Sequence, residues 1–75
     1  MVQKTLILHA TYPDESGFTR TMTRAYPVPS ENFDTIYSIL VEQVGAEYNA
    51  SEGRFEFHSL GDMYLAIEKT IYYML

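Results

Sequence analysis

Two histidines and a few carboxylates are the side chains of this sequence that could carry acid–base or metal chemistry. His9 and His58 fall on outward-facing positions of predicted strands, and Glu56 shares that face. Imidazole nitrogens exchange protons near neutral pH and bind transition metals, so two neighbouring histidines could form a proton-transfer or metal pair. A metal needs more ligands than this set supplies. We therefore expect no metal and no cofactor.

The other residue types that enzymes use lie in ordinary contexts. Glu47 and Glu56 could pair as acid and base, but two carboxylates on exposed strands stay ionised. No serine lies in a Gly-x-Ser-x-Gly elbow, the four glycines fall at predicted turns or helix ends, and the chain has no cysteine. We therefore expect a non-enzymatic protein and keep a small enzyme as an alternative.

The charge balance bears on the kind of partner. Ten acidic residues stand against five basic ones, and the formal net charge is −5. Such a chain repels nucleic-acid phosphates and suits a basic protein surface. The apolar run Leu6–Leu8 is too short for a signal peptide or a membrane span. We therefore expect a cytoplasmic protein that contacts neither membrane nor nucleic acid directly.

The strongest structural pattern is helical and covers residues 30–44. Ser30 suits the helix start, where its hydroxyl accepts a backbone N–H, and Gly45 suits the left-handed residue that ends a helix. The apolar stripe of this segment consists of Phe33, Ile36, Tyr37, Leu40, Val41 and Val44.

Residues 2–12 and 18–28 alternate as two strands of a hairpin, and the turn residues 13–17 join them. We expect Tyr12 to pair with Phe18, and Pro27 and Pro29 to end the second strand. Arg20 and Arg24 then fall on the core side. Either a bulge turns them outward or their stems lie along the apolar layer.

The second half predicts a shorter hairpin followed by a helix. Residues 46–50 and 54–60 form the strands, and Phe55 and Phe57 share the core face. Gly61-Asp62 is expected to begin a helix that runs to the C-terminus. Its predicted apolar stripe consists of Tyr64, Ile67, Ile71, Met74 and Leu75.

These elements predict an α+β fold: a small two-layer ββαββα sandwich, with an antiparallel sheet and two helices on one of its faces. If the weak strand at 46–50 does not form, the order becomes ββαβα. Residues 1–75 form a single domain. Residues 34–40 share Thr-Ile-Tyr and a final Leu with residues 69–75, which suggests an internal hairpin–helix repeat of 1–45 and 46–75.

Tracing the direction of each predicted element brings five acidic residues to one end of the sheet. We expect this acidic pole to bind a basic surface of another protein, one that normally binds nucleic acid. Phage and mobile-element anti-defence proteins, including anti-CRISPR proteins, are often of this size and charge. The chain is thus interpreted as a small acidic inhibitor. The pole consists of Asp14, Glu15, Glu42, Glu47 and Asp62.

Two further surfaces are candidates for contact. The uncovered sheet face is β-branched and weakly charged, so the chain could pair with a copy of itself as a structural or regulatory homodimer. Consecutive residues of a helix cannot all face inward, so Tyr72, Tyr73 and Met74 form a candidate aromatic patch. The candidate dimer face consists of Ile7, His9, Thr21, Thr23 and His58.

Overall fold

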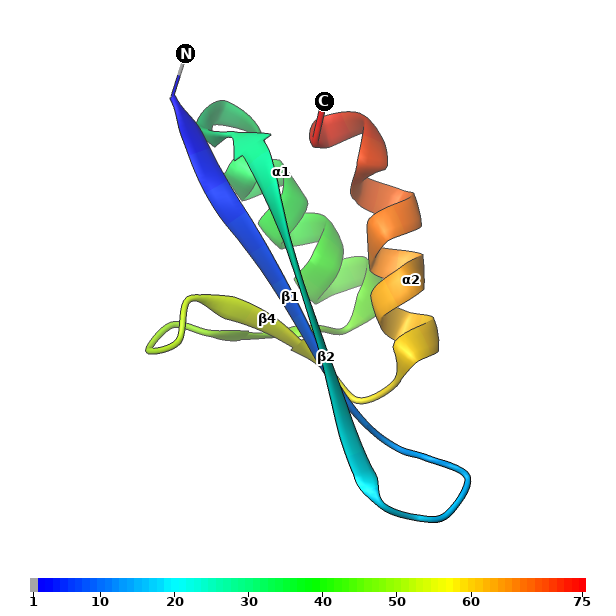
Figure 1. The fold of residues 1–75 in the computed structure, drawn as a ribbon. Coiled ribbons are helices and arrows are strands. Elements are labelled where there is room, and N and C mark those ends of the chain that lie inside the picture. Colours follow the sequence, from blue (N-terminus) through cyan, green and yellow to red (C-terminus); the bar gives the residue numbers. More distant parts are fainter. Residues whose placement is uncertain (1) are drawn as a thin grey trace.

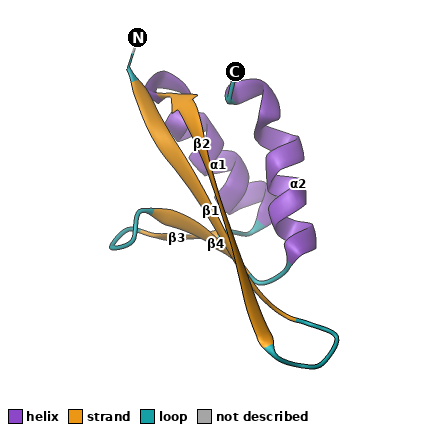
Figure 2. Ribbon diagram, in the orientation of Figure 1, coloured by secondary structure: helices purple, strands orange, loops and turns teal. Residues whose placement is uncertain are grey.

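The computed structural model describes residues 2–75 and forms two layers, a sheet and a pair of helices (Figure 1). Both helices lie on the same side of the sheet, and the first hairpin extends beyond them (Figure 2). The elements are β1 (Gln3–Pro13), β2 (Thr19–Pro29), η1 (Ser30–Asn32), α1 (Phe33–Ser38), η2 (Ile39–Val44), β3 (Glu47–Asn49), β4 (Arg54–Phe57), α2 (Leu60–Thr70) and η3 (Ile71–Tyr73).

The predicted α+β class and the ββαββα order are confirmed, and the third strand forms. The strand order is β2-β1-β4-β3. The sheet is mixed rather than wholly antiparallel, because β4 runs parallel to β1, with Leu8 opposite Phe55. Phe55 and Phe57 give β4 an apolar face, and in its central place in the sheet the helices cover that face. The more polar β3 lies at the edge of the sheet.

The first hairpin forms, but its register differs by two residues from the predicted one. Tyr12 pairs with Arg20 rather than with Phe18. The reason is a tighter turn: the Asp14 N–H donates to the Phe18 carbonyl at 2.8 Å, and Gly17 takes a left-handed φ of 83°. This three-residue loop with a glycine bulge holds two residues fewer than the loop we expected.

A shift of two residues keeps every side chain on its predicted face. Leu6, Leu8 and Ala10 are fully buried, as expected. The pairing of β1 with β2 is continuous, so no bulge turns Arg20 and Arg24 outward. They remain on the helix side of the edge strand, where Arg20 forms an ion pair with Asp14 and Arg24 lies over the Tyr64 ring.

Pro27 lies inside β2, whereas Pro29 is its last residue, so the strand ends at Pro29, one residue beyond the predicted bound. The Asp14–Phe18 hydrogen bond and the Ser30–Val2 hydrogen bond show that even-numbered residues of β2 bond to β1. In an antiparallel ladder the intervening odd-numbered residues then direct their backbone groups to the other side. Both prolines hold odd positions at the free edge of the sheet, so neither removes a ladder hydrogen bond.

The predicted helix 30–44 is confirmed as one continuous helical segment, and its helical geometry changes along its length. It passes from 3₁₀ through α to π geometry. Ser30 is not its cap: Pro29 holds that position, and no side-chain capping bond forms. Gly45 ends the segment with a φ of 85°, as expected. Ile36 and Leu40 are fully buried.

α2 begins at Leu60, one residue before the predicted start at Gly61-Asp62, and is rotated about its axis relative to the prediction. Ser59 is its N-cap, and the Ser59 Oγ accepts the Asp62 N–H at 3.1 Å. The buried face consists of Met63, Ala66 and Thr70, whereas Tyr64, Ile71 and Leu75 of the predicted stripe are exposed. Small residues at 66 and 70 allow the helix backbone to approach the sheet. The Thr70 hydroxyl donates to the Ala66 carbonyl at 2.6 Å, so its burial leaves no polar group unpaired.

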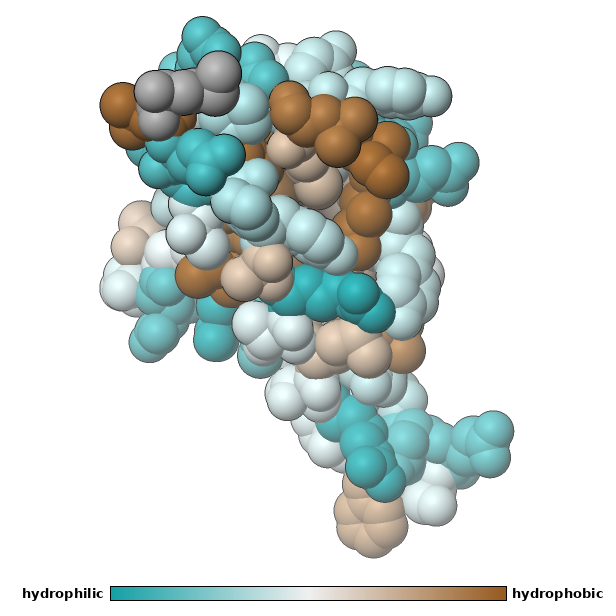
Figure 3. Space-filling view, turned by 45° about the horizontal axis from the view of Figure 1, so that its top comes forward, coloured by the Kyte–Doolittle hydropathy of each residue, from teal (hydrophilic) through white to brown (hydrophobic). Residues whose placement is uncertain are grey.

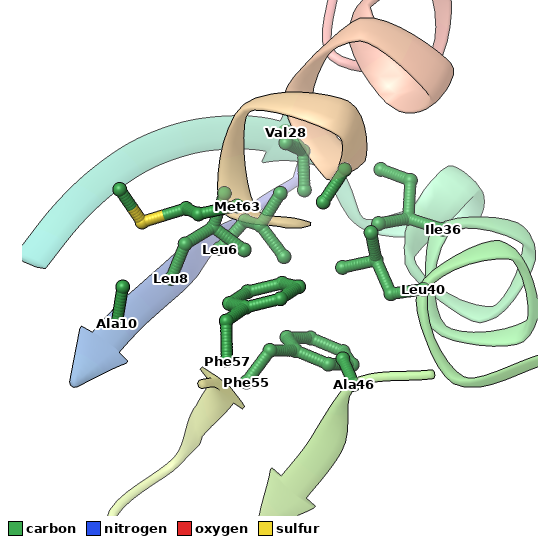
Figure 4. Packing of buried hydrophobic residues seen from close by; sticks show 11 residues of the cluster. Leu6, Leu8, Ala10, Val28, Ile36, Leu40, Ala46, Phe55, Phe57 and Met63 are labelled. Carbon is green, nitrogen blue, oxygen red and sulfur yellow. The ribbon is translucent and has the colours of Figure 1, made fainter. Parts of the chain in front are cut away.

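The core lies where β1 and β4 meet the two helices (Figure 4). Phe55 is its centre: its ring contacts those of Phe33, Tyr37 and Tyr48, with ring centroids 4.8–6.1 Å apart. Such aromatic contacts add to the stability that burial alone provides. Figure 4 shows further buried side chains around it from both hairpins and both helices: Leu6, Leu8, Ala10, Val28, Ile36, Leu40, Ala46, Phe57 and Met63.

Both halves of the chain consist of a hairpin followed by a helix, but the sheet uses them differently. The first hairpin places its first strand at the centre of the sheet, whereas the second places its second strand there. The internal repeat therefore stays a prediction. Within residues 2–75, no helix has the length and apolar character that crossing a membrane requires.

Candidate functional site

A row of polar side chains crosses the open face of the sheet. His9 pairs with Thr23 on β2 and with Glu56 on β4, and Glu56 pairs with Glu47 on β3. Neighbouring positions across a sheet lie about 5 Å apart, so all four side chains stand side by side. The structure thus brings together the imidazole and the carboxylates that the sequence analysis singled out.

His9 is held by a hydrogen bond between its Nδ1 and the Thr23 Oγ1, 2.8 Å long. His9 is half-buried and Thr23 is exposed. A neutral imidazole with an unprotonated Nδ1 accepts this proton, and an imidazolium donates to the same oxygen. The contact therefore holds in either protonation state, and it orients the ring on the face.

Glu56 is the anchored carboxylate of the row. Its Oε2 accepts from Arg54 Nε at 2.9 Å and from Asn49 Nδ2 at 3.3 Å. These donors, and more weakly the nearby His9, hold the pKa of Glu56 below its usual value. Glu47 stands opposite Glu56 on the same face, and its Oε1 lies 3.7 Å from the Nε2 of His58. Each carboxylate thus has its own cationic or polar neighbour, which offsets the repulsion between them.

The two histidines have separate partners, Thr23 for His9 and Glu47 for His58. Among residues 2–75 no three histidine, aspartate or glutamate side chains are grouped closely enough to hold a metal ion. Both ends of the row, Thr23 and Glu47, are open to solvent, whereas His9 and Glu56 in its middle are half-buried.

The acidic pole divides into two regions. β4 runs parallel to β1, so the start of α2 with Asp62 faces the same end as Asp14 and Glu15, as we expected from tracing the chain. However, the hairpin turn lies well beyond the start of α2 (Figure 1). The shallow hollow at this turn is lined by the hairpin alone, through Tyr12, Asp14, Glu15, Ser16 and Arg20.

Asp14 organises that turn. Its Oδ2 accepts from Arg20 Nε at 2.9 Å, and its Oδ1 accepts the backbone N–H groups of Ser16 and Phe18. The Arg20 guanidinium, together with these backbone donors, holds the pKa of Asp14 below its usual value. Asp14 is therefore a turn-forming residue whose charge is already balanced, and Glu15 carries the excess charge of the tip.

The five basic side chains are mostly engaged within the chain, and the carboxylates mostly are not. Arg20 and Arg54 form ion pairs, whereas Lys4 and Arg24 lie against aromatic rings. In the described part of the chain, seven of the ten carboxylates lack an ion-pair partner, since ten minus the three in ion pairs leaves seven. These are Glu15, Glu31, Asp34, Glu42, Glu52, Asp62 and Glu68.

The three residues of the predicted aromatic patch, Tyr72, Tyr73 and Met74, differ in how far their side chains are exposed. Tyr72 is 83% exposed, whereas Met74 packs on the core. The Tyr73 carbonyl accepts a hydrogen bond from Asn32 Nδ2 at 3.0 Å, which ties this turn to the first helical segment. Of the predicted patch, the side chain that extends furthest into solvent is therefore that of Tyr72.

The sequence analysis missed the apolar row on the outer flank of α2. Tyr64, Ile71 and Leu75 were predicted to lie in the core. The signal that could have placed them outside is the pair Ala66 and Thr70, whose small side chains are fully buried and so permit a close approach of helix to sheet.

Comparison with family models, with curated proteins and with solved structures found no match to this chain.

Proposed function

We propose that this chain is a non-enzymatic inhibitor or regulator that covers a basic, nucleic-acid-binding surface of a larger protein. The supporting observation is the unequal pairing of its charges. Most carboxylates carry no ion pair among the described residues, whereas four of the five basic groups are satisfied internally. A surface of this kind attracts a basic partner and repels free nucleic acid.

The elements present these carboxylates on rigid supports. Glu42 lies on η2 and Asp62 on the first turn of α2, and both are exposed. Side chains fixed by a helix lose less conformational entropy on binding than side chains of a flexible segment. Glu15 lies at the projecting hairpin turn, where it can enter a recess of the partner.

The proposed mechanism is steric and electrostatic. The exposed carboxylates of Glu15, Glu42 and Asp62, which we call the acidic end, take the place of the phosphate backbone on the partner, and the body of the domain blocks access. Binding of this kind weakens steeply as salt increases. Phage or mobile-element anti-defence proteins act in this manner in the host cytoplasm, and we place this chain in that class by analogy of size and charge.

The test compares two matched sets of charge reversals. The first set changes the acidic end: Glu15→Lys, Glu42→Lys and Asp62→Lys. The second set changes the remaining surface: Glu52→Lys, Glu31→Lys and Asp34→Lys. Each set contains one turn residue, one helical glutamate and one first-turn aspartate, and each moves the net charge from −5 to +1 by adding six charges.

Immobilised wild-type protein and both variants are incubated with nuclease-treated bacterial lysate at increasing salt. We expect the wild type to retain a nucleic-acid-binding protein, the first variant to lose at least tenfold in affinity for it, and the second to keep it. Purified partner should then lose its nucleic acid when the wild type is added. Equal loss by both variants, or a retained protein that does not bind nucleic acid, contradicts the proposal.

A further inference from the structure

β2 is a long edge strand whose outer backbone groups have no partner among residues 2–75. It ends the sheet order β2-β1-β4-β3. Because its even-numbered residues bond to β1, the N–H and C=O groups of its odd-numbered residues point away from the sheet. We call the outward backbone groups of four of these residues the free edge. The four residues are Thr19, Thr21, Thr23 and Ala25.

The free edge carries little of the protection that exposed strands usually have. Pro27 blocks donation only at its far end. Between Thr19 and Ala25 the strand has no proline, no bulge and no lysine. Its charged side chains are Arg20, which is bound to Asp14, and Arg24, which lies 5.9 Å from the centre of the Tyr64 ring.

An apolar row runs from α2 through η3 to Leu75, and its first residue, Tyr64, contacts β2. Tyr64 is 45% exposed, Ile71 45% and Leu75 88%, and we call these three residues the α2 row. The Tyr64 hydroxyl lies 3.8 Å from the Met22 sulfur, which places this flank of the helix next to β2. The Asn32–Tyr73 hydrogen bond joins η3 to η1. Figure 3 shows apolar surface over the C-terminal part of α2 and η3.

We propose that two copies of this chain pair through the β2 edges, antiparallel about a two-fold axis at Thr23. The two sheets then join into one, and the α2 rows of both copies face each other above the joined strands. This proposal does not depend on the proposed function, because it uses the backbone groups of β2 and three apolar side chains, none of which is a carboxylate.

A second copy is the occupant that fits both features together. An added strand alone would satisfy the free edge and leave the α2 row uncovered. A second copy supplies a strand and, on the same side of the joined sheet, another helix with an apolar row. Exposed apolar side chains that form one contiguous surface mark contact sites on proteins.

The charges of β2 are compatible with self-pairing in this register. β2 has no carboxylate, although the chain as a whole carries −5, so the two paired strands do not repel each other through acidic groups. Pairing about Thr23 places Met22 opposite Arg24 and Arg20 opposite Tyr26. Pairing about Met22 would instead place Arg20 opposite Arg24, and like charges directly opposite are unfavourable.

The first test removes one outward N–H. Thr23→Pro leaves the β1–β2 ladder intact, because Pro27 already occupies an equivalent position. Light scattering from micromolar to near-millimolar concentration should give twice the 8.7 kDa chain mass for the wild type and the single mass for this variant. Thr23→Ala, which keeps the N–H, should remain a dimer. Circular dichroism reports whether each variant folds.

The second test concerns the α2 row and holds even if the proline variant does not fold. Ile71→Glu should halve the mass, whereas Leu65→Glu, on the solvent side of α2, should not. Ile7→Lys separates the alternatives: it disrupts a dimer that stacks the open faces and spares the edge-paired one. In the wild type, hydrogen exchange at the Thr21, Thr23 and Ala25 amides should slow as concentration rises.

Three outcomes overturn the proposal. They are a wild type of single mass at every concentration, a dimer that survives Ile71→Glu, and a dimer lost in Ile7→Lys but kept in a folded Thr23→Pro. The last outcome would assign the contact to the open face instead, where the sequence predicted it at Ile7, His9, Thr21, Thr23 and His58.

Discussion

Asn32 and Tyr73 are 41 residues apart in sequence, and the Asn32 side-chain amide donates to the Tyr73 carbonyl at 3.0 Å. This bond joins the start of the first helical segment to the turn that follows α2. The last carbonyls of a helix have no partner within it, so an outside donor stabilises this end. The bond thus fixes the C-terminal turn, and with it the α2 row, against the rest of the helix layer.

Asn32→Ala should therefore loosen the C-terminal turn without unfolding the domain. We expect a loss of about 0.5–1.5 kcal/mol in the free energy of unfolding, the usual net contribution of one hydrogen bond. Amide exchange at residues 71–74 should quicken more than exchange in β1. Gln43→Ala, an exposed position of the same helical segment, serves as the control and should change neither quantity. Unchanged exchange at residues 71–74 would show that the turn is held without this bond.

Phe55 and Phe18 offer the same substitution in opposite environments. Phe55 is 1% exposed and Phe18 is 71% exposed. Phe55→Ala should cost about 3–5 kcal/mol, which is much of the stability of so small a domain, and Phe18→Ala less than about 0.5 kcal/mol. Urea unfolding followed by circular dichroism measures both. Comparable losses would contradict the core described above.

The two helix starts differ in whether a serine caps them. Ser59 accepts the Asp62 N–H, whereas Ser30 makes no capping bond. We expect Ser59→Ala to lower the free energy of unfolding by about 1 kcal/mol, the usual value for a lost cap, and Ser30→Ala to change it little. Thermal unfolding of both variants decides this. A larger loss at Ser30 would restore the assignment made from sequence.

We expect the stability of the fold to depend on pH through two carboxylates, those of Asp14 and Glu56. Arg20 holds the pKa of Asp14 low, and Arg54, with Asn49, does the same for Glu56. Because folding lowers these pKa values, the folded chain binds fewer protons than the unfolded chain in this range, and stability rises with pH. The stabilisation that these two carboxylates provide is complete above the ordinary carboxyl pKa of about 4. It is lost as the pH falls through their lowered pKa values.

Arg20→Gln and Arg54→Gln test this assignment separately. Each should raise the pKa of its own carboxyl toward the ordinary value, as followed by NMR titration, and leave the other unchanged. The acid limb of the stability curve should become shallower in both variants. If Arg20→Gln leaves the pKa of Asp14 in place, the backbone donors of the turn, and not the guanidinium, set it.

The sequence by itself determined the local elements, because each depends on contacts close in the chain. Alternation placed Leu6, Leu8 and Ala10 on the buried face, and Phe55 and Phe57 on the same side of the second hairpin. Helical spacing and Gly45 gave the bounds of the segment 30–44. The charge excess of the site was likewise readable from composition.

Tertiary structure decided the relations between those elements. The register of the first hairpin depends on where the loop closes around Asp14 and Gly17, which the turn residues alone do not specify. The parallel pairing of β4 with β1 depends on which strand offers the larger apolar face to the helices.

The rotation of α2 shows the physical reason most clearly. Hydrophobicity favoured Tyr64, Ile71 and Leu75 as its core face, but close packing favoured the small Ala66 and Thr70. Burial depends on how near two backbones can approach, and that distance is a property of both surfaces together. The free apolar row beside β2, on which the proposed dimer rests, therefore exists only in the folded chain.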